Sequence, residues 1–148
     1  MKDKLTNGFI QGLIAGIVSS IADLIMVNWL KFGDIRFLDY AGTHIYGFKP
    51  ETFGEQIFAQ LVQFIFTGLL GIIFVYLIDK VKQRNILFKG LIYGITVWFL
   101  IFNITILFKL EPLDQISFVC ALENFIASLI FGAVIAIAYA VLSKKIVD

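Results

Sequence analysis

The chain has 148 residues, of which 59% are hydrophobic and 16% are charged, and its formal net charge is +1. Soluble domains carry roughly 25% charged residues, and one this small could not bury so much apolar surface, so lipid must surround much of the chain. A net charge this small gives no strong positive potential that would attract nucleic acid, so we expect no nucleic-acid partner. The single cysteine, Cys120, excludes an internal disulfide bond and a cysteine-based metal cluster.

Four continuous apolar stretches follow one another along the chain, at about residues 8–30, 56–78, 86–108 and 116–142. A helix of roughly 20 residues, rising 1.5 Å per residue, spans the hydrocarbon core of a bilayer. Transmembrane strands would need short segments of alternating polarity, which these stretches are not. We therefore predict an all-α polytopic membrane protein, a single membrane domain in which four transmembrane helices form a bundle.

The first stretch has a small residue at every fourth position, namely Gly8, Gly12, Gly16 and Ser20. This spacing places the four residues on one helix face and lets another helix backbone approach closely. Asp23, the one charged residue of the stretch, follows three residues after Ser20 and lies on the same face. We expect this face to point into the bundle and to touch the second or fourth span.

The other spans have polar or small stripes of their own. The fourth span repeats the pattern of the first with Asn124, Ser128, Gly132, Ala136 and Ala140, and the second carries Gln56, Gln60, Gln63, Thr67 and Gly71 on one face. The third has a small face of Gly90, Gly94, Ile101 and Thr105 and a polar face of Lys89, Thr96 and Asn103. We expect the small faces to be where helices pack.

The connection between the first two spans, residues 31–54, is longer than a simple hairpin loop. One helical face would collect Ile35, Leu38, Ala41, Gly42 and Ile45, and the opposite face Arg36, Asp39 and Thr43. We predict a short amphipathic segment over about residues 34–47 that lies at the membrane interface and is ended by Gly47 and Pro50. The alternative is an irregular polar loop.

Polar side chains from all four spans fall at a similar depth. They are Asp23 in the first span, Gln60 and Gln63 in the second, Asn103 in the third, and Glu123 with Asn124 in the fourth. Counted at 1.5 Å per residue, they lie roughly 7–11 Å below the boundary on the side of the 31–54 connection. Carboxylates at such a depth are usually paired or functional. The alternative is that these groups only join neighbouring helices.

Two details of this layer stay open. Glu123 is about 100° around its helix from Asn124, so it need not face the same neighbour as Asp23. His44, on the outer segment, either caps the layer or lies among lipid headgroups.

Most signatures of enzymes and cofactor sites are missing from the sequence. There is no phosphate-binding loop, and the glycines of the first span do not form a dinucleotide-binding turn. One histidine cannot supply an H-E-x-x-H zinc site or two axial haem ligands, and no Ser-His-acid set stands out. We therefore expect no catalytic residues, no metal, no cofactor and no enzymatic activity.

The distribution of basic residues predicts the orientation. The side that holds both termini carries Lys2, Lys4, Lys80, Lys82, Arg84, Lys89, Lys144 and Lys145, whereas the other carries Lys31, Arg36, Lys49 and Lys109. Since basic residues favour the cytoplasm, we expect a multi-pass protein of the plasma (inner) membrane with both termini cytoplasmic.

Two stretches show a resemblance to known proteins. They are Gly12-Leu-Ile-Ala-Gly16-Ile-Val-Ser-Ser20 in the first span and Lys89-Gly90-Leu-Ile-Tyr93-Gly94-Ile-Thr-Val-Trp98 in the third. Together with the order of the spans, they resemble the small uncharacterised bacterial inner-membrane proteins of the YagU and YqhR type. The resemblance implies a bacterial plasma-membrane protein of unestablished function and provides no catalytic residues.

Two functions of different classes agree with the sequence. In the first, the protein binds or passes a small polar solute, an ion or a proton through an outward-opening polar layer, in which Asp23 and Glu123 carry the charge and Gln60, Gln63, Asn103 and Asn124 are neutral ligands. In the second, it is a structural or assembly protein whose small-residue faces pack against a second copy or against other membrane subunits. Membrane lipid is a partner in both.

Overall fold

The computed structural model describes residues 3–81, 84–111, 113 and 115–144, and of residues 143 and 144 it describes the backbone only. The elements are α1 (Lys4–Leu24), a π-helix η1 (Ile25–Trp29) that continues it, α2 (Phe37–Tyr46), α3 (Phe53–Lys80), α4 (Ile86–Leu107) and α5 (Phe118–Lys144). Four segments are long and apolar enough to cross a membrane: Lys4–Trp29, Phe53–Lys80, Ile86–Leu107 and Phe118–Leu142. The prediction of an all-α, four-helix membrane bundle is confirmed, and the chain is a multi-pass membrane protein.

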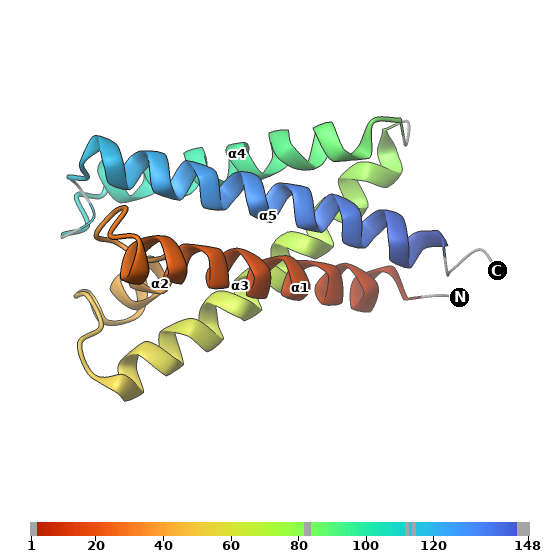
Figure 1. The fold of residues 1–148 in the computed structure, drawn as a ribbon. Coiled ribbons are helices and arrows are strands. Elements are labelled where there is room, and N and C mark those ends of the chain that lie inside the picture. The colour runs from red at the N-terminus through yellow and green to blue at the C-terminus, as the bar shows by residue number, and fades with distance from the viewer. Residues whose placement is uncertain (1–2, 82–83, 112, 114, 145–148) are drawn as a thin grey trace.

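The long helices form two crossing pairs joined by α1 and α5. α1 packs against α3, α5 packs against α4, and α1 and α5 lie side by side between them. The beginning of α1 and the end of α5 lie at one end of the bundle, which we call the terminal end, and α2 lies at the opposite end, which we call the capped end (Figure 1). The first and last spans are therefore neighbours at the centre of the fold.

Local signals in the sequence explain where the helices begin and end. The carboxylate of Asp3 accepts hydrogen bonds from the Leu5 N–H and the Thr6 hydroxyl at the start of α1, and these bonds hold the pKa of Asp3 below its usual value. Thr52 and Glu55 form a reciprocal capping box at the start of α3. α2 ends at Gly47, whose φ of 77° is left-handed and suits a residue without a side chain.

The small-residue face of α1 lies directly against α3. A Cβ atom added at Gly12 would overlap the Thr67 carbonyl oxygen, and one added at Gly71 would overlap the carbonyl oxygen of Gly8. Gly16 lies against the Thr67 side chain. The two backbones are in contact at this crossing, so only glycine fits at its centre.

The pair formed by α4 and α5 uses the same arrangement. A Cβ atom at Gly90 would overlap the Gly132 carbonyl oxygen and the Ala136 side chain, and one at Gly94 would overlap the Ser128 carbonyl oxygen. Within the described residues, these small faces are thus occupied by other helices of the same chain.

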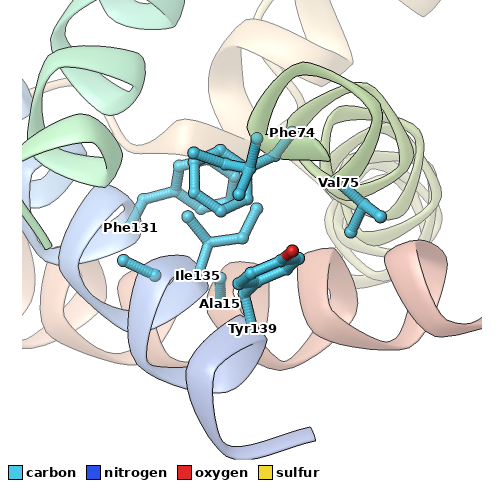
Figure 2. Packing of buried hydrophobic residues seen from close by; sticks show 8 residues of the cluster. Ala15, Phe74, Val75, Phe131, Ile135 and Tyr139 are labelled. Carbon is cyan, nitrogen blue, oxygen red and sulfur yellow. The ribbon is translucent and has the colours of Figure 1, made fainter. Parts of the chain in front are cut away.

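A hydrophobic core fills the space between α1, α3 and α5. Figure 2 shows Phe74 and Val75 of α3 facing Phe131, Ile135 and Tyr139 of α5, over Ala15 of α1, which is 0% exposed. The Tyr139 ring meets that of Phe74 edge to face, with ring centroids 6.1 Å apart. Because lipid chains are as apolar as these side chains, the core stabilises the bundle mainly through close van der Waals packing.

At the terminal end, polar contacts join three helices. Asp79 of α3 pairs with Lys4 of α1 at 2.6 Å and accepts a hydrogen bond of 2.9 Å from the Tyr139 hydroxyl of α5. Lys4 is well exposed, so the ion pair adds little stability by itself.

The segment predicted at residues 34–47 is the helix α2, not an irregular loop, but its predicted faces are partly wrong. Leu38 and Gly42 are buried as expected, yet Asp39 and Thr43 of the predicted polar face are only 0% and 3% exposed, while Ile45 is 38% exposed. The reason is electrostatic: Asp39 is paired inside the fold, so its burial leaves no charge without a partner.

Candidate functional site

Two carboxyl groups meet inside the capped end of the bundle. Asp23 lies in the last turn of α1 and Glu123 in the second turn of α5, and their residues are 1% and 0% exposed. Because α1 and α5 pack side by side, the two carboxyl groups are close enough to interact directly. We call them the carboxyl pair.

The carboxyl pair has few donors around it. One Asp23 oxygen accepts a hydrogen bond of 3.0 Å from the Phe37 N–H. The second Asp23 oxygen and both Glu123 oxygens have no partner among the groups that the structure describes. Ionised carboxylates only accept hydrogen bonds, so two of them can bond to one another only if one holds a proton. One shared proton would give both groups a partner and remove one buried charge.

Residues 31–36 cover the carboxyl pair at the capped end. Gly33 has a φ of 102°, and a Cβ atom there would lie 3.3 Å from the Cβ and Cγ atoms of Glu123. Glycine thus serves two needs here, the backbone conformation and the close approach to α5. The chain then runs to Phe37, whose N–H binds Asp23. The pair is therefore covered in this structure rather than open to the outside.

Tyr40 of α2 is a further polar group near the carboxyl pair. It is 9% exposed and packs with Ile35, Leu113 and Cys120, and its hydroxyl has no partner among the described residues. Burial raises the pKa of Tyr40, and neighbouring Cys120 and Glu123 raise it further. The phenol therefore keeps its proton and remains a hydrogen-bond donor near the carboxyl pair.

An ion-pair network holds α2 in place over this site. Arg36 binds both carboxylate oxygens of Asp39, with Nη2–Oδ1 at 2.8 Å and Nε–Oδ2 at 3.1 Å, and its Nη1 donates to Gln56 of α3 at 3.3 Å. Lys49 lies 3.6 Å from Asp39 Oδ2. The nearby cations are thus engaged by Asp39, and no ion pair of the described residues includes the carboxyl pair.

The glutamines predicted for the polar layer form a separate cluster. Gln63 Nε2 donates to Ser20 Oγ at 3.0 Å, and Gln60 Nε2 donates to the same oxygen at 3.3 Å and to Gln63 Oε1 at 3.0 Å. These bonds join α3 to α1 one helical turn away from Asp23. The glutamine amides donate hydrogen bonds to acceptors within the cluster, and polar side chains between membrane helices usually join the helices in this way.

The remaining predicted site residues bond mainly to their own helices. Asn103 Nδ2 donates to the Phe99 carbonyl at 2.8 Å, and Asn124 Nδ2 donates to the Cys120 carbonyl at 2.8 Å, with Asn124 Oδ1 left without a partner among the described groups. His44 Nδ1 lies 2.6 Å from the Tyr40 carbonyl oxygen, and the His44 side chain is exposed. The structure thus brings Asp23 and Glu123 together and places Asn103 and His44 elsewhere.

A cavity of about 430 Å³ lies beside these groups, between α3 and α4 and below α2. Its lining includes Tyr40 and Asn124 but neither Asp23 nor Glu123. The carboxyl pair is therefore not part of the lining of this cavity. Sequence patterns do not single out Tyr40 or Gly33, because their roles depend on how residues 31–36 fold back over α5.

The carboxyl pair is suited to a proton more than to a metal ion. No group of three or more His, Cys, Asp or Glu side chains in the described part of the chain is placed to hold a metal. A proton needs only the two acceptors that the pair already provides. Comparisons with protein-family models, with curated proteins and with solved structures found no match for this chain, so the chemistry of the pair is the guide to its function.

Proposed function

We propose that this membrane protein binds one proton between Asp23 and Glu123 and exchanges it with water at the capped end. The observation that supports this most is that both carboxyl groups are buried next to each other and that no described residue forms an ion pair with either. Two buried charges of the same sign would each cost several kcal/mol, and one proton removes much of that cost while adding a charge-assisted hydrogen bond. Ionisable residues inside membrane spans commonly serve proton relays.

The surroundings of the carboxyl pair support exchange at the capped end. Residues 31–36 and α2 lie over the pair at that end, and the contacts of Asp39 with Arg36 and Lys49 help to hold α2. The π-helix η1 begins two residues after Asp23, and π turns within helices are frequent at functional sites. In this proposal, a small movement of the cover admits water and lets the proton leave.

Proton exchange is tested by neutralising the pair. After a pH jump in weakly buffered detergent solution that contains a pH-sensitive dye, we expect the wild type to release about one proton per chain more than Asp23→Asn/Glu123→Gln. Each change keeps the shape of the side chain but removes the group that takes up and releases the proton. Asn103→Ala is the matched control, because the Asn103 amide donates to the Phe99 carbonyl of its own helix, and it should keep the wild-type proton release.

Infrared spectroscopy tests the shared proton itself. At neutral pH the wild-type protein should show the C=O band of a protonated carboxylic acid that shifts in heavy water, and Asp23→Asn/Glu123→Gln should lack it. Absence of this band from the wild type would contradict proton binding by the pair. Equal proton release from the wild type and the double variant would contradict proton exchange by the pair.

The orientation is part of the same proposal: the capped end faces outside, and both termini are cytoplasmic, as the basic residues indicate. In a Cys120→Ala background, we expect an impermeant thiol reagent to label Glu51→Cys on intact cells and to leave Arg84→Cys unlabelled. Both positions are exposed, so accessibility on the protein surface does not differ. Labelling of position 84 alone would reverse the orientation.

The alternative is a structural or assembly protein whose small-residue faces bind partner subunits. It finds less support, because Gly8, Gly12, Gly90, Gly94 and Gly132 already contact helices of the same chain. A partner would have to bind through other faces of the bundle.

A further inference from the structure

The cavity beside α2 is a second site, distinct from the carboxyl pair. α3 and α4 meet where the Tyr93 hydroxyl donates to the Leu70 carbonyl at 2.6 Å, and the rings of Tyr93 and Phe74 lie 5.1 Å apart. From there towards the capped end, α3 and α4 do not pack against each other, and the cavity occupies the space between them. α2 forms its roof through Ala41 and Ile45.

The lining of this cavity offers almost nothing to a polar ligand. Val62 and Phe66 of α3, Val97 and Ile101 of α4 and Phe131 of α5 supply apolar walls. The polar residues among them use their groups elsewhere: Thr67 Oγ1 donates to the Phe64 carbonyl at 2.9 Å, Ser128 Oγ donates to the Asn124 carbonyl at 2.8 Å, and Gln63 donates to Ser20. A polar solute would lose its bonds to water here and find no replacements.

Three further polar atoms on the lining residues do not change this conclusion. The Tyr40 hydroxyl, Trp98 Nε1 and Asn124 Oδ1 have no partner among the described groups, but all three atoms are covered by their neighbours and do not face the open space. The cavity therefore suits an apolar group that needs no hydrogen bond.

We propose that the cavity binds one acyl chain of a membrane lipid, which enters sideways between α3 and α4. Both helices are membrane-spanning segments, so lipid hydrocarbon is the material next to the opening. The cavity is bounded by α2 at one end and by the Tyr93–Leu70 contact at the other. A transmembrane helix from a second copy, about 10–12 Å wide with its side chains, would need a groove along the whole bundle. A single flexible chain fits between these two limits.

The two tryptophans of the chain make this proposal testable by fluorescence. Trp98 lines the cavity, and the other, Trp29, is 81% exposed. In a Trp29→Phe background, Trp98 is the only emitter. We expect phosphatidylcholine with brominated acyl chains to quench its fluorescence strongly, because bromine quenches indole at contact distance.

Variants that fill the cavity distinguish quenching by a lipid chain bound inside it from quenching by the lipid that surrounds any membrane protein. Val62→Phe and Ala41→Phe fill it independently from α3 and from α2, and each should remove most of the quenching. Ile65→Phe is the matched control on α3, since Ile65 is 54% exposed and outside the cavity, and it should keep the quenching. Circular dichroism checks that each variant is folded.

The same variants serve in native mass spectrometry. The wild type released from mild detergent should retain one lipid molecule per chain, and a filling variant should retain none. Unchanged quenching in both filling variants would overturn the proposal, as would a retained second copy of the protein in place of lipid. The proton site is not needed for this result, since neither Asp23 nor Glu123 lines the cavity.

Discussion

Gly12→Leu is expected to lower the melting temperature of the detergent-solubilised protein far more than Gly54→Leu. At Gly12 a side chain would overlap the Thr67 carbonyl oxygen and the backbone of Gly71. Backbone atoms cannot turn aside as a side chain can, so α1 and α3 would have to separate. Overpacking typically costs about 1–3 kcal/mol and occasionally more, and we expect the upper part of this range.

Gly54 provides the control because it also lies in a helix that spans the membrane, α3. Nothing lies within 4 Å of a Cβ atom placed there, and its backbone is not in the left-handed region. Gly54→Leu should therefore leave the melting temperature almost unchanged. Equal losses for the two variants would show that the crossing of α1 and α3 does not govern stability.

Asp39→Ala should be the most damaging change at the capped end. The Asp39 side chain is 0% exposed, and its loss leaves the guanidinium of Arg36, whose side chain is 16% exposed, without its carboxylate. Breaking a buried ion pair in this way costs about 3–5 kcal/mol, and because Arg36 can regain some water, we expect about 3 kcal/mol. Loss of the pair should also free α2, so that limited proteolysis cuts the 31–52 connection faster.

A double substitution separates the charge from the packing. Arg36→Met/Asp39→Leu removes both charges and keeps most of the volume, so it should recover much of the stability that Asp39→Ala loses. A double variant as unstable as Asp39→Ala would mean that shape, rather than the unpaired cation, dominates. Thermal unfolding of the three variants in one detergent gives the comparison.

The spans could be predicted from the sequence because the signal lies within each segment. A membrane-crossing helix needs a continuous apolar stretch, and the predicted stretch 56–78 lies inside α3, Phe53–Lys80. The third predicted span, residues 86–108, extends only one residue beyond the end of α4, Ile86–Leu107. Helix caps such as Thr52 shift the ends by only a few residues.

The arrangement of the candidate site depends on contacts between segments far apart in the chain. The spacing of residues in α5 gave no means of deciding whether Glu123 faces Asp23, because that depends on how α5 is rotated against α1. Asp39 looked like a surface residue of an amphipathic helix, and only its pairing with Arg36 and Lys49 explains its burial. The cavity depends on the divergence of α3 from α4, which no local pattern encodes.

The contact between α1 and α5 also has a consequence for how the protein is made. Asp23 lies in α1 and Glu123 in α5, so the two residues are synthesised about 100 residues apart, with α3 and α4 between them. Until α5 has been added, α1 has its partner α3 but lacks the helix that covers Asp23. The nascent chain therefore carries an incompletely enclosed carboxyl group until α5 has been made, and the bundle closes only when α5 packs against α1.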